Sequence, residues 1–224
     1  MGDLLVAKGL CKHYQTGQTR IDVLKGIDLT VGQGEIVAVV GASGVGKSTL
    51  LHLLGGLDHP SEGTVVIDNQ DVFALSDADR SQFRNRHIGF VFQFHHLLND
   101  FTALENAMMP LLIGGVAAES ARESAQELLK AVGLDHRLHH LPAELSGGEA
   151  QRVAVVRALV AKPDVVLADE PSGNLDATRS QELHALMWHL ARSRNQTFVI
   201  ATHDLALSEK ADRVVCLEDG HIVC

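Results

Sequence analysis

Apolar positions near both ends of the chain fall into short runs of strand length. Valine, isoleucine and leucine gather at about 4–10, 21–31, 64–67, 88–92, 164–167, 197–201 and 213–217. Runs of this length, bounded by polar or glycine-rich segments, are typical of strands. A further apolar run at 35–40 leads into a glycine-rich loop, and the leucine-rich segment 47–54 after it predicts a largely buried helix.

The middle of the chain, about 99–160, has helical periodicity instead. The segment Thr102–Glu105 matches a capping box, which predicts that a helix begins there. Gly133 and Pro163 are expected to end two later helices, because glycine favours the position after a helix and proline cannot continue one. After the helix that begins near Thr102, further helices are expected at 119–132, 146–161 and 178–193.

Strands that alternate with helices predict an α/β fold with a mainly parallel sheet. The leading strands suggest an antiparallel β flank, and the helical middle is expected to form a subdomain. We therefore expect a single domain over residues 1–224, with a core at about 1–93 and 162–224 and an α-helical subdomain at about 94–161.

Composition and charge narrow the class of protein. With 46% hydrophobic residues, the chain can bury a sizeable core, and its formal charge of -9 argues against a nucleic-acid partner, which would need a basic face. No uninterrupted apolar run reaches about 18 residues, and the N-terminus lacks the features of a signal peptide. Cys11, Cys216 and Cys224 are odd in number and form no CxxC pair, which fits a reducing cytosol.

The segment Gly41–Ser48 matches the pattern G-x-x-x-x-G-K-S between an expected strand and an expected helix. Its glycines let backbone N–H groups surround phosphate oxygens, and the helix N-terminus adds a favourable dipole. Lys47 supplies a cation for the β- and γ-phosphates, and the Ser48 hydroxyl suits Mg²⁺. The nucleotide-binding residues predicted here are Gly41, Ser43, Gly44, Gly46, Lys47, Ser48 and Thr49.

Two acids, Asp169 and Glu170, close a buried apolar run, where unpaired carboxylates would be costly. Beside a phosphate loop, we expect Asp169 to orient a Mg²⁺-bound water. Glu170 would then polarise the water that attacks the γ-phosphate. The alternative is an acid pair that only caps the following turn.

Three further residues are candidates for the same site. His203 and Gln93 follow expected strands, at the edge where ligands of parallel sheets gather. His203 is placed to hydrogen-bond the γ-phosphate, and Gln93 to touch Mg²⁺ or the attacking water, although a structural role is the plainer interpretation of a single histidine. Tyr14 is either an adenine-stacking aromatic or a surface residue.

The segment Leu145–Glu149 has two interpretations. Ser146 and Glu149 match a capping box, so the segment can be a simple helix cap. Because Gly147 and Gly148 have no side chains, they would also leave the backbone N–H groups at the helix start exposed, so that this helix start can bind phosphate. Since the phosphate loop already occupies one side of its own nucleotide, this element is more useful to a second copy. The sequence therefore predicts a head-to-tail homodimer with two enclosed nucleotides.

Taken together, these elements resemble the ATPase subunits of ABC transporters over essentially the whole chain. The matching segments are Gly41–Ser48 (Walker A), Gln93 (Q-loop), Leu145–Glu149 (signature), Val165–Asp169 with Glu170 (Walker B and catalytic acid), Gly173–Asp176 (D-loop) and His203 (switch histidine). Tyr14 falls where the family places its adenine-stacking aromatic. The resemblance implies a RecA-like P-loop NTPase core, ATP hydrolysis with Mg²⁺, and a homodimer of ATPase subunits.

Within the family, Leu51–Asp58, Phe92–Leu98 and Phe101–Asn106 resemble the ATPases of the bacterial lipoprotein-releasing system. That resemblance implies a peripheral protein at the cytoplasmic face of the inner membrane. Two integral membrane subunits would dock near the Gln93 loop and handle the lipoprotein cargo. The ATPase of a related antibiotic or peptide exporter, or of a cell-division ABC complex, is the alternative.

Other classes fit less well. A soluble ABC protein of DNA repair or translation would usually carry coiled-coil insertions or a second ATPase domain, and a GTPase would need an Asn-Lys-x-Asp motif. The chain departs from the family at Glu149, where most members have Gln. Because a carboxylate beside a γ-phosphate would be repulsive, we expect Glu149 to turn back to the Ser146 backbone N–H. The serine hydroxyl and the glycine N–H groups are then left for phosphate.

Overall fold

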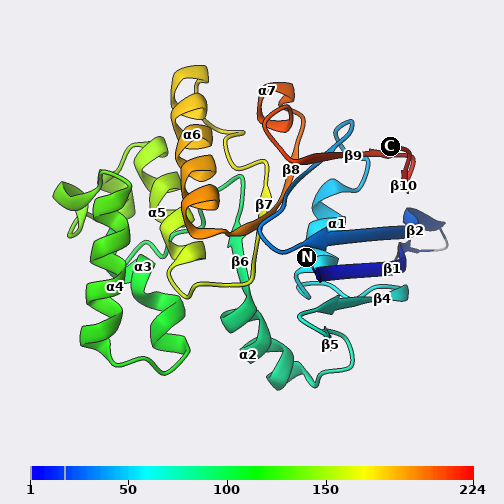
Figure 1. Ribbon diagram of the computed structural model, residues 1–224, viewed down its shortest axis with the longest axis horizontal. Coiled ribbons are helices and arrows are strands. Elements are labelled where there is room, and N and C mark those ends of the chain that lie inside the picture. The colour runs from blue at the N-terminus through cyan, green and yellow to red at the C-terminus, as the bar shows by residue number, and fades with distance from the viewer. Residues whose placement is uncertain (1, 18) are drawn as a thin grey trace.

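The computed structural model describes residues 2–17 and 19–224, which form two sheets with helices around them (Figure 1). An antiparallel sheet has the order β2-β1-β4-β5, with β1 at Asp3–Thr16, β2 at Thr19–Gly32, β4 at Glu62–Ile67 and β5 at Gln70–Asp71. The second sheet has the order β10-β9-β3-β8-β7-β6. Its strands are β3 (Ile36–Val40), β6 (Ile88–Val91), β7 (Val165–Asp169), β8 (Thr197–Thr202), β9 (Arg213–Glu218) and β10 (His221–Ile222). All of its pairings are parallel except that of β10 with β9.

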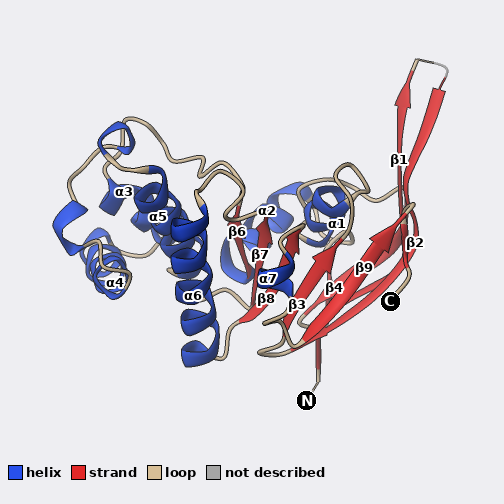
Figure 2. Cartoon of the chain, turned by 90° about the horizontal axis from the view of Figure 1, so that it is seen from above, coloured by secondary structure: helices blue, strands red, loops and turns tan. Residues whose placement is uncertain are grey.

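The helices separate into two groups in space (Figure 2). Their bounds are α1 (Lys47–Leu54), α2 (Asp77–His87), α3 (Ala103–Ile113), α4 (Ala118–Ala131), α5 (Gly147–Leu159), α6 (Ala177–Arg194) and α7 (Leu205–Ser208), with short 3₁₀ turns at Asp135–Arg137 and Pro142–Glu144. Helices α3, α4 and α5 gather beyond β6, on the side away from the antiparallel sheet. The α/β fold, the mainly parallel sheet and the antiparallel flank expected from the sequence are confirmed.

Alternate residues of the central strands face two different hydrophobic cores. Val199 packs in a core shared with α1 and the antiparallel sheet, whereas its neighbour Ile200 packs in a core with α3, α4, α5 and α6. Because side chains alternate across a strand, a strand buried on both faces must be apolar throughout. This explains the continuous apolar runs of β7 and β8. Burial on both faces also holds the carboxyl ends of these strands in place, and Asp169 and Thr202 lie at those ends.

Several boundaries differ from the sequence-based expectation. The helix expected to reach Ala161 ends at Leu159, because the backbone turns over the next residues and Lys162, just before Pro163, has a left-handed φ of 53°. Strand β1 continues to Thr16, well past position 10, because its second half pairs with β2. Helix α2 was not anticipated, since it is strongly polar and Arg80 is its only buried residue. The sequence does contain one signal for its start, the N-cap residue Ser76. In the structure the Ser76 side chain accepts a hydrogen bond from the Asp79 backbone N–H.

Cys216 and Cys224 form a disulfide bond, with their Cα atoms 5.1 Å apart. This bond was not predicted from the sequence, in which the three cysteines fit a reducing cytosol. The reason is the antiparallel hairpin of β9 and the segment after it, in which the Val223 N–H donates to the Cys216 carbonyl oxygen. Cys11 is a free thiol. Among the described residues, no helix is both long and apolar enough to cross a bilayer.

Candidate functional site

The loop between β3 and α1 forms one wall of a pocket of about 690 Å³. Gly44 and Gly46 have φ values of 79° and 111°, a left-handed backbone that residues with a Cβ rarely adopt. Gly46 also occupies the N-cap position of α1, so the loop passes directly into the helix start. The pocket is lined by Val23, Ser43, Gly44, Gly46, Lys47, Ser48, Thr49, Gln93, Glu170 and His203.

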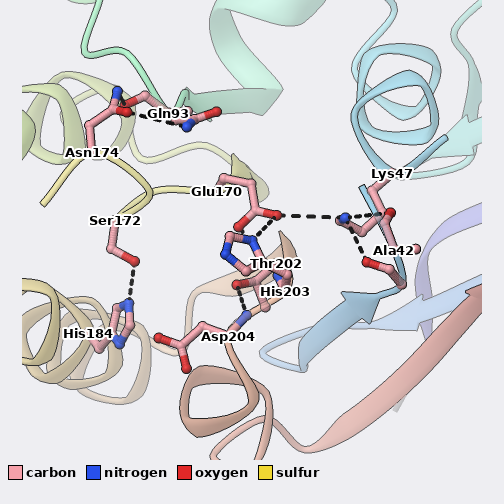
Figure 3. A network of polar contacts seen from close by, with 11 residues as sticks. Ala42, Lys47, Gln93, Glu170, Ser172, Asn174, His184, Thr202, His203 and Asp204 are labelled. Carbon is pink, nitrogen blue, oxygen red and sulfur yellow. Dashed lines mark hydrogen bonds and ion pairs between the residues drawn. The ribbon is translucent and has the colours of Figure 1, made fainter. Parts of the chain in front are cut away.

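Lys47 is the cation of this pocket, and its side chain is only 7% exposed. Its ammonium donates hydrogen bonds to the carbonyl oxygens of Gly41 at 2.9 Å and Ala42 at 3.2 Å. The same nitrogen lies 3.7 Å from Glu170 Oε1. The loop carbonyls therefore hold the ammonium at the wall of the pocket, where an anion can reach it (Figure 3).

Glu170 comes directly after β7 and has a left-handed φ of 44°. Its backbone N–H donates to the Ala201 carbonyl oxygen of β8 at 2.9 Å, which ties this turn to the neighbouring strand. Its carboxylate oxygen Oε1 lies 2.8 Å from His203 Nδ1, and Oε2 accepts a hydrogen bond from the His203 backbone N–H. The two residues that the sequence placed at strand ends are thus brought together, facing Lys47 (Figure 3).

Asp169, the last residue of β7, has a buried carboxylate oxygen, Oδ1, without a hydrogen-bond partner in the described part of the chain. A buried unpaired carboxylate oxygen is costly unless a cation or a bound water satisfies it. Mg²⁺ binds through one or two oxygen ligands of the protein and keeps several waters. Asp169 does not line the pocket, but its unpartnered oxygen and the oxygens of Ser48 and Gln93 in the pocket are of the type that this ion prefers.

Gln93 follows β6 and lies in the pocket, but its side chain also contacts the segment after Glu170. Its Nε2 donates to Asn174 Oδ1 at 3.3 Å, and the Asn174 side chain donates back to the Gln93 carbonyl oxygen at 3.0 Å. The Q-loop and D-loop segments are therefore locked together in this conformation (Figure 3).

Tyr14 is one of the predicted nucleotide contacts that lie outside the pocket lining, together with Gly41. It is 41% exposed and does not line the pocket. Its hydroxyl donates to Asp58 Oδ2 at 2.9 Å, and the Lys12 ammonium lies 4.8 Å from its ring centroid. Burial, followed by the Asp58 carboxylate, raises the pKa of the Tyr14 hydroxyl.

The Ser-Gly-Gly element lies at the N-terminus of α5 and does not line the pocket that contains Lys47. Ser146 and Gly148 line a separate, smaller pocket of about 250 Å³. The expected capping box is confirmed, since the Ser146 backbone N–H donates to Glu149 Oε2 at 2.8 Å and the Glu149 N–H donates to Ser146 Oγ at 3.3 Å. One copy of the chain therefore does not bring the two glycine-rich elements to one site.

Sequence reasoning missed Arg137, which pairs with this cap. Its Nε donates to Glu149 Oε1 at 2.9 Å. The Ser146 backbone N–H, supported by the Ser146 hydroxyl and the Arg137 guanidinium, lowers the pKa of Glu149 to about 2. Glu149 is therefore ionised at neutral pH.

Two polar residues of α5 were also missed, although polar residues on the buried face of a helix are a usable signal. Gln151 is 3% exposed, and its side chain donates to the Phe92 carbonyl oxygen at 2.8 Å. The Arg157 guanidinium donates to the carbonyl oxygens of His95 and His96, both at 2.7 Å. Helix α5 thus holds the backbone on both sides of Gln93.

A groove of about 470 Å³ lies beside this segment, between α2, α3 and β6. Its apolar lining includes Phe90, Phe92 and Ile113, and Ile113 is 69% exposed. Phe94, next to Gln93, is 64% exposed. Large exposed apolar side chains beside a groove mark an interaction surface.

Comparison with known families gives a match to the family model described as "ABC transporter", over residues 24–173. The chain is 57% identical over 223 residues to the "Lipoprotein-releasing system ATP-binding protein LolD" of Geobacter metallireducens, covering 100% of this chain and 99% of that one.

Two solved structures are similar as well. The dimeric structure of MJ0796, titled a bacterial ABC transporter cassette, has a TM-score of 0.91 and 38% identity, covering 99% of this chain and 97% of that chain. A dimeric post-hydrolysis state of MJ0796 bound to ADP and Pi has the same TM-score and coverage, with 37% identity.

Proposed function

The chain belongs to the ABC transporter family, and we propose that it powers a system that releases lipoproteins from the bacterial inner membrane toward the outer membrane. As a member of this family it is an ATPase. Lys47, Glu170 and His203 around one pocket support ATP hydrolysis. Lipoprotein release is supported by similarity, over the whole chain, to a relative whose name is the ATP-binding protein of such a system.

The predicted catalytic, phosphate-binding and metal-binding residues have separate roles in ATP hydrolysis under this proposal. Lys47 and the loop amides bind the β- and γ-phosphates. Glu170 accepts a proton from the attacking water, and His203 positions that carboxylate and contacts the γ-phosphate. Ser48 and Asp169, with Gln93, would hold Mg²⁺, whose charge stabilises the negative charge that develops during phosphoryl transfer.

Two copies complete the site in this mechanism. Ser146, Gly147 and Gly148 of one copy bind the triphosphate held by Lys47 of the other, so two nucleotides join a head-to-tail homodimer. The separate positions of the two elements within one chain support this arrangement, as do the dimeric structures of the relative. Tyr14 is proposed to stack on adenine.

The groove beside Gln93 is the proposed docking site for two integral membrane subunits, one on each copy. With that docking, the ATPase would be a peripheral protein on the cytoplasmic face of the inner membrane, and the membrane subunits would handle the lipoprotein. The hydrogen bonds from α5 to the backbone at Phe92, His95 and His96 provide a connection between the signature and this groove. Movement of α5 on closure would therefore reach the membrane partners.

The test uses the ATPase together with the integral membrane proteins that co-purify with it, reconstituted in liposomes that carry a labelled lipoprotein. Mg-ATP is expected to release the lipoprotein into solution, and Glu170→Gln is expected to abolish the release. The exposed Glu218→Gln serves as the matched control, with release retained. Vesicles that hydrolyse ATP and export a small peptide or antibiotic, without releasing lipoprotein, would contradict the assignment.

A further inference from the structure

Glu149 places a negative charge at a helix start where phosphate is expected to bind. Its carboxylate is ionised at neutral pH, since its pKa is lowered to about 2. Two anions a few ångström apart repel each other, and the repulsion grows when water is excluded between them. An interface that closes on a triphosphate therefore has to neutralise or redirect this carboxylate.

Both oxygens of the Glu149 carboxylate are held by donors on its own chain. Oε2 accepts from the Ser146 backbone N–H at 2.8 Å, and Oε1 accepts from Arg137 Nε at 2.9 Å. The side chains are 21% exposed for Glu149 and 33% exposed for Arg137, so the pair is partly shielded from solvent. The capping hydrogen bond and the guanidinium together set the direction of the carboxylate, and the guanidinium also compensates its charge.

The segment that carries Arg137 is itself fixed in place. The carbonyl oxygens of Leu138 and His140 accept hydrogen bonds from the first N–H groups of α3, at 3.0 and 2.9 Å. Arg137 Nη1 lies 3.0 Å from His140 Nε2. The guanidinium is therefore presented to Glu149 by a braced turn and not by a freely moving loop.

The other arginines around the Ser-Gly-Gly element have carboxylate partners of their own. Arg152, on the same helix as Glu149, lies 2.7 Å from Glu182, and Arg179 lies 3.5 Å from Asp176. Among the described residues, Arg137 is the cation that forms an ion pair with Glu149. Its loss would leave the Glu149 charge without an ion-pair partner.

We propose that Arg137 is a positioning residue for ATP hydrolysis: it neutralises Glu149 and keeps that carboxylate turned back into the helix cap. This role rests on the proposed function, in which the signature of one copy meets the triphosphate of the other. The glycine N–H groups of Gly147 and Gly148 then meet the phosphate without a competing free carboxylate. A chain with Gln at position 149 would have no need of Arg137 for this purpose.

The test measures the ATP concentration that produces half-maximal dimer, by light scattering, in protein carrying Glu170→Gln so that turnover does not interfere. Adding Arg137→Ala is expected to raise this concentration about tenfold, the range typical of coupled contacting residues. Adding Glu149→Gln to that protein is expected to restore most of the affinity, because the unpaired charge is gone. Arg192→Ala, which breaks the Arg192–Asp212 ion pair outside the pocket of Ser146 and Gly148, is the control and should have little effect.

A purely structural role for Arg137 predicts a different pattern. In that case the Arg137→Ala defect would persist, or deepen, in the protein that also carries Glu149→Gln, and this result would overturn the inference. So would an unchanged ATP requirement in Arg137→Ala. Failure of the Glu170→Gln protein to dimerise at all would instead overturn the proposed function and the inference with it. In the active protein, Arg137→Ala should raise the KM for ATP more than it lowers kcat, and Arg137→Lys should recover part of the loss.

Discussion

Glu170 Oε1 lies 2.8 Å from His203 Nδ1, so the residues that follow two adjacent strands, β7 and β8, share one contact. The Lys47 ammonium is 3.7 Å from the same oxygen. Glu170, His203 and Lys47, the proposed base, the residue that orients it and the proposed phosphate-binding cation, therefore face one pocket. This pre-assembly suits hydrolysis, which depends mainly on positioning and electrostatic stabilisation.

Removing the Lys47 ammonium is expected to abolish tight ATP binding. A charge-assisted hydrogen bond contributes about 1.5–3 kcal/mol, so Lys47→Ala should weaken ATP binding by about 10- to 100-fold. Calorimetric titration with ATP measures this directly. Lys8→Ala, which removes an exposed lysine outside the pocket, is the control and should bind normally. Equal affinity in the two variants would contradict the placement of Lys47 at the phosphates.

Asp169→Asn is expected to raise the Mg²⁺ requirement of turnover without lowering the thermal stability of the protein. If Asp169 orients a metal-bound water, the Mg²⁺ concentration for half-maximal turnover should rise by about 10- to 100-fold. Without nucleotide, the variant should be at least as stable to heat as the parent protein, because it replaces a buried carboxylate whose Oδ1 lacks a partner. A large loss of stability with an unchanged Mg²⁺ requirement would show a structural role instead.

The phosphate loop and the acid pair were predictable from the sequence because their chemistry depends on neighbours in the chain. Gly44, Gly46 and Lys47 act through local backbone geometry, and Glu170 is placed by the end of the strand that precedes it. Arg137 was not predictable, because its pairing with Glu149 depends on a turn that is anchored to α3. The polar helix α2 was missed for a related reason, since its apolar periodicity is weak.

The same distinction explains the other missed contacts. The Cys216–Cys224 bond depends on a hairpin that cannot be predicted from the spacing of the cysteines. The partners of Gln151 and Arg157 could not be predicted because they are backbone carbonyl oxygens, which carry no sequence signal. The positions of Ser146 and Gly148 relative to a second copy likewise depend on an assembly and not on one chain.

The capped Glu149 carboxylate is expected to make the free energy of unfolding depend on pH in the acidic range. The pKa of Glu149 falls from 4.5 to about 2 in the folded chain. A lowered carboxyl pKa contributes stability that is fully present above its ordinary value and is lost as the pH falls from about 5 to about 2. Urea unfolding across this range should therefore show a steeper loss for the parent protein than for Glu149→Gln. Parallel curves would contradict the lowered pKa.

A charge placed in the groove beside Gln93 should block the membrane partners without preventing ATP binding. Ile113→Asp introduces a carboxylate at an apolar side chain that is 69% exposed, and a buried unpaired charge at an interface is costly. Far less membrane protein should then co-purify. Val223→Asp changes an exposed apolar residue outside the groove and is the matched control. Similar losses in both variants would indicate a general effect of surface charge.

The most direct measurement concerns the oligomeric state of Glu170→Gln with and without Mg-ATP, by light scattering. The variant lacks the general base, so turnover should fall by about 100-fold or more while binding persists. A stable dimer that forms with ATP and dissociates when ADP replaces it is the expected result, and Ser146→Arg, which fills the helix start proposed to bind phosphate, should prevent it. A Glu170→Gln protein that binds ATP tightly and remains a monomer would contradict the shared triphosphate site.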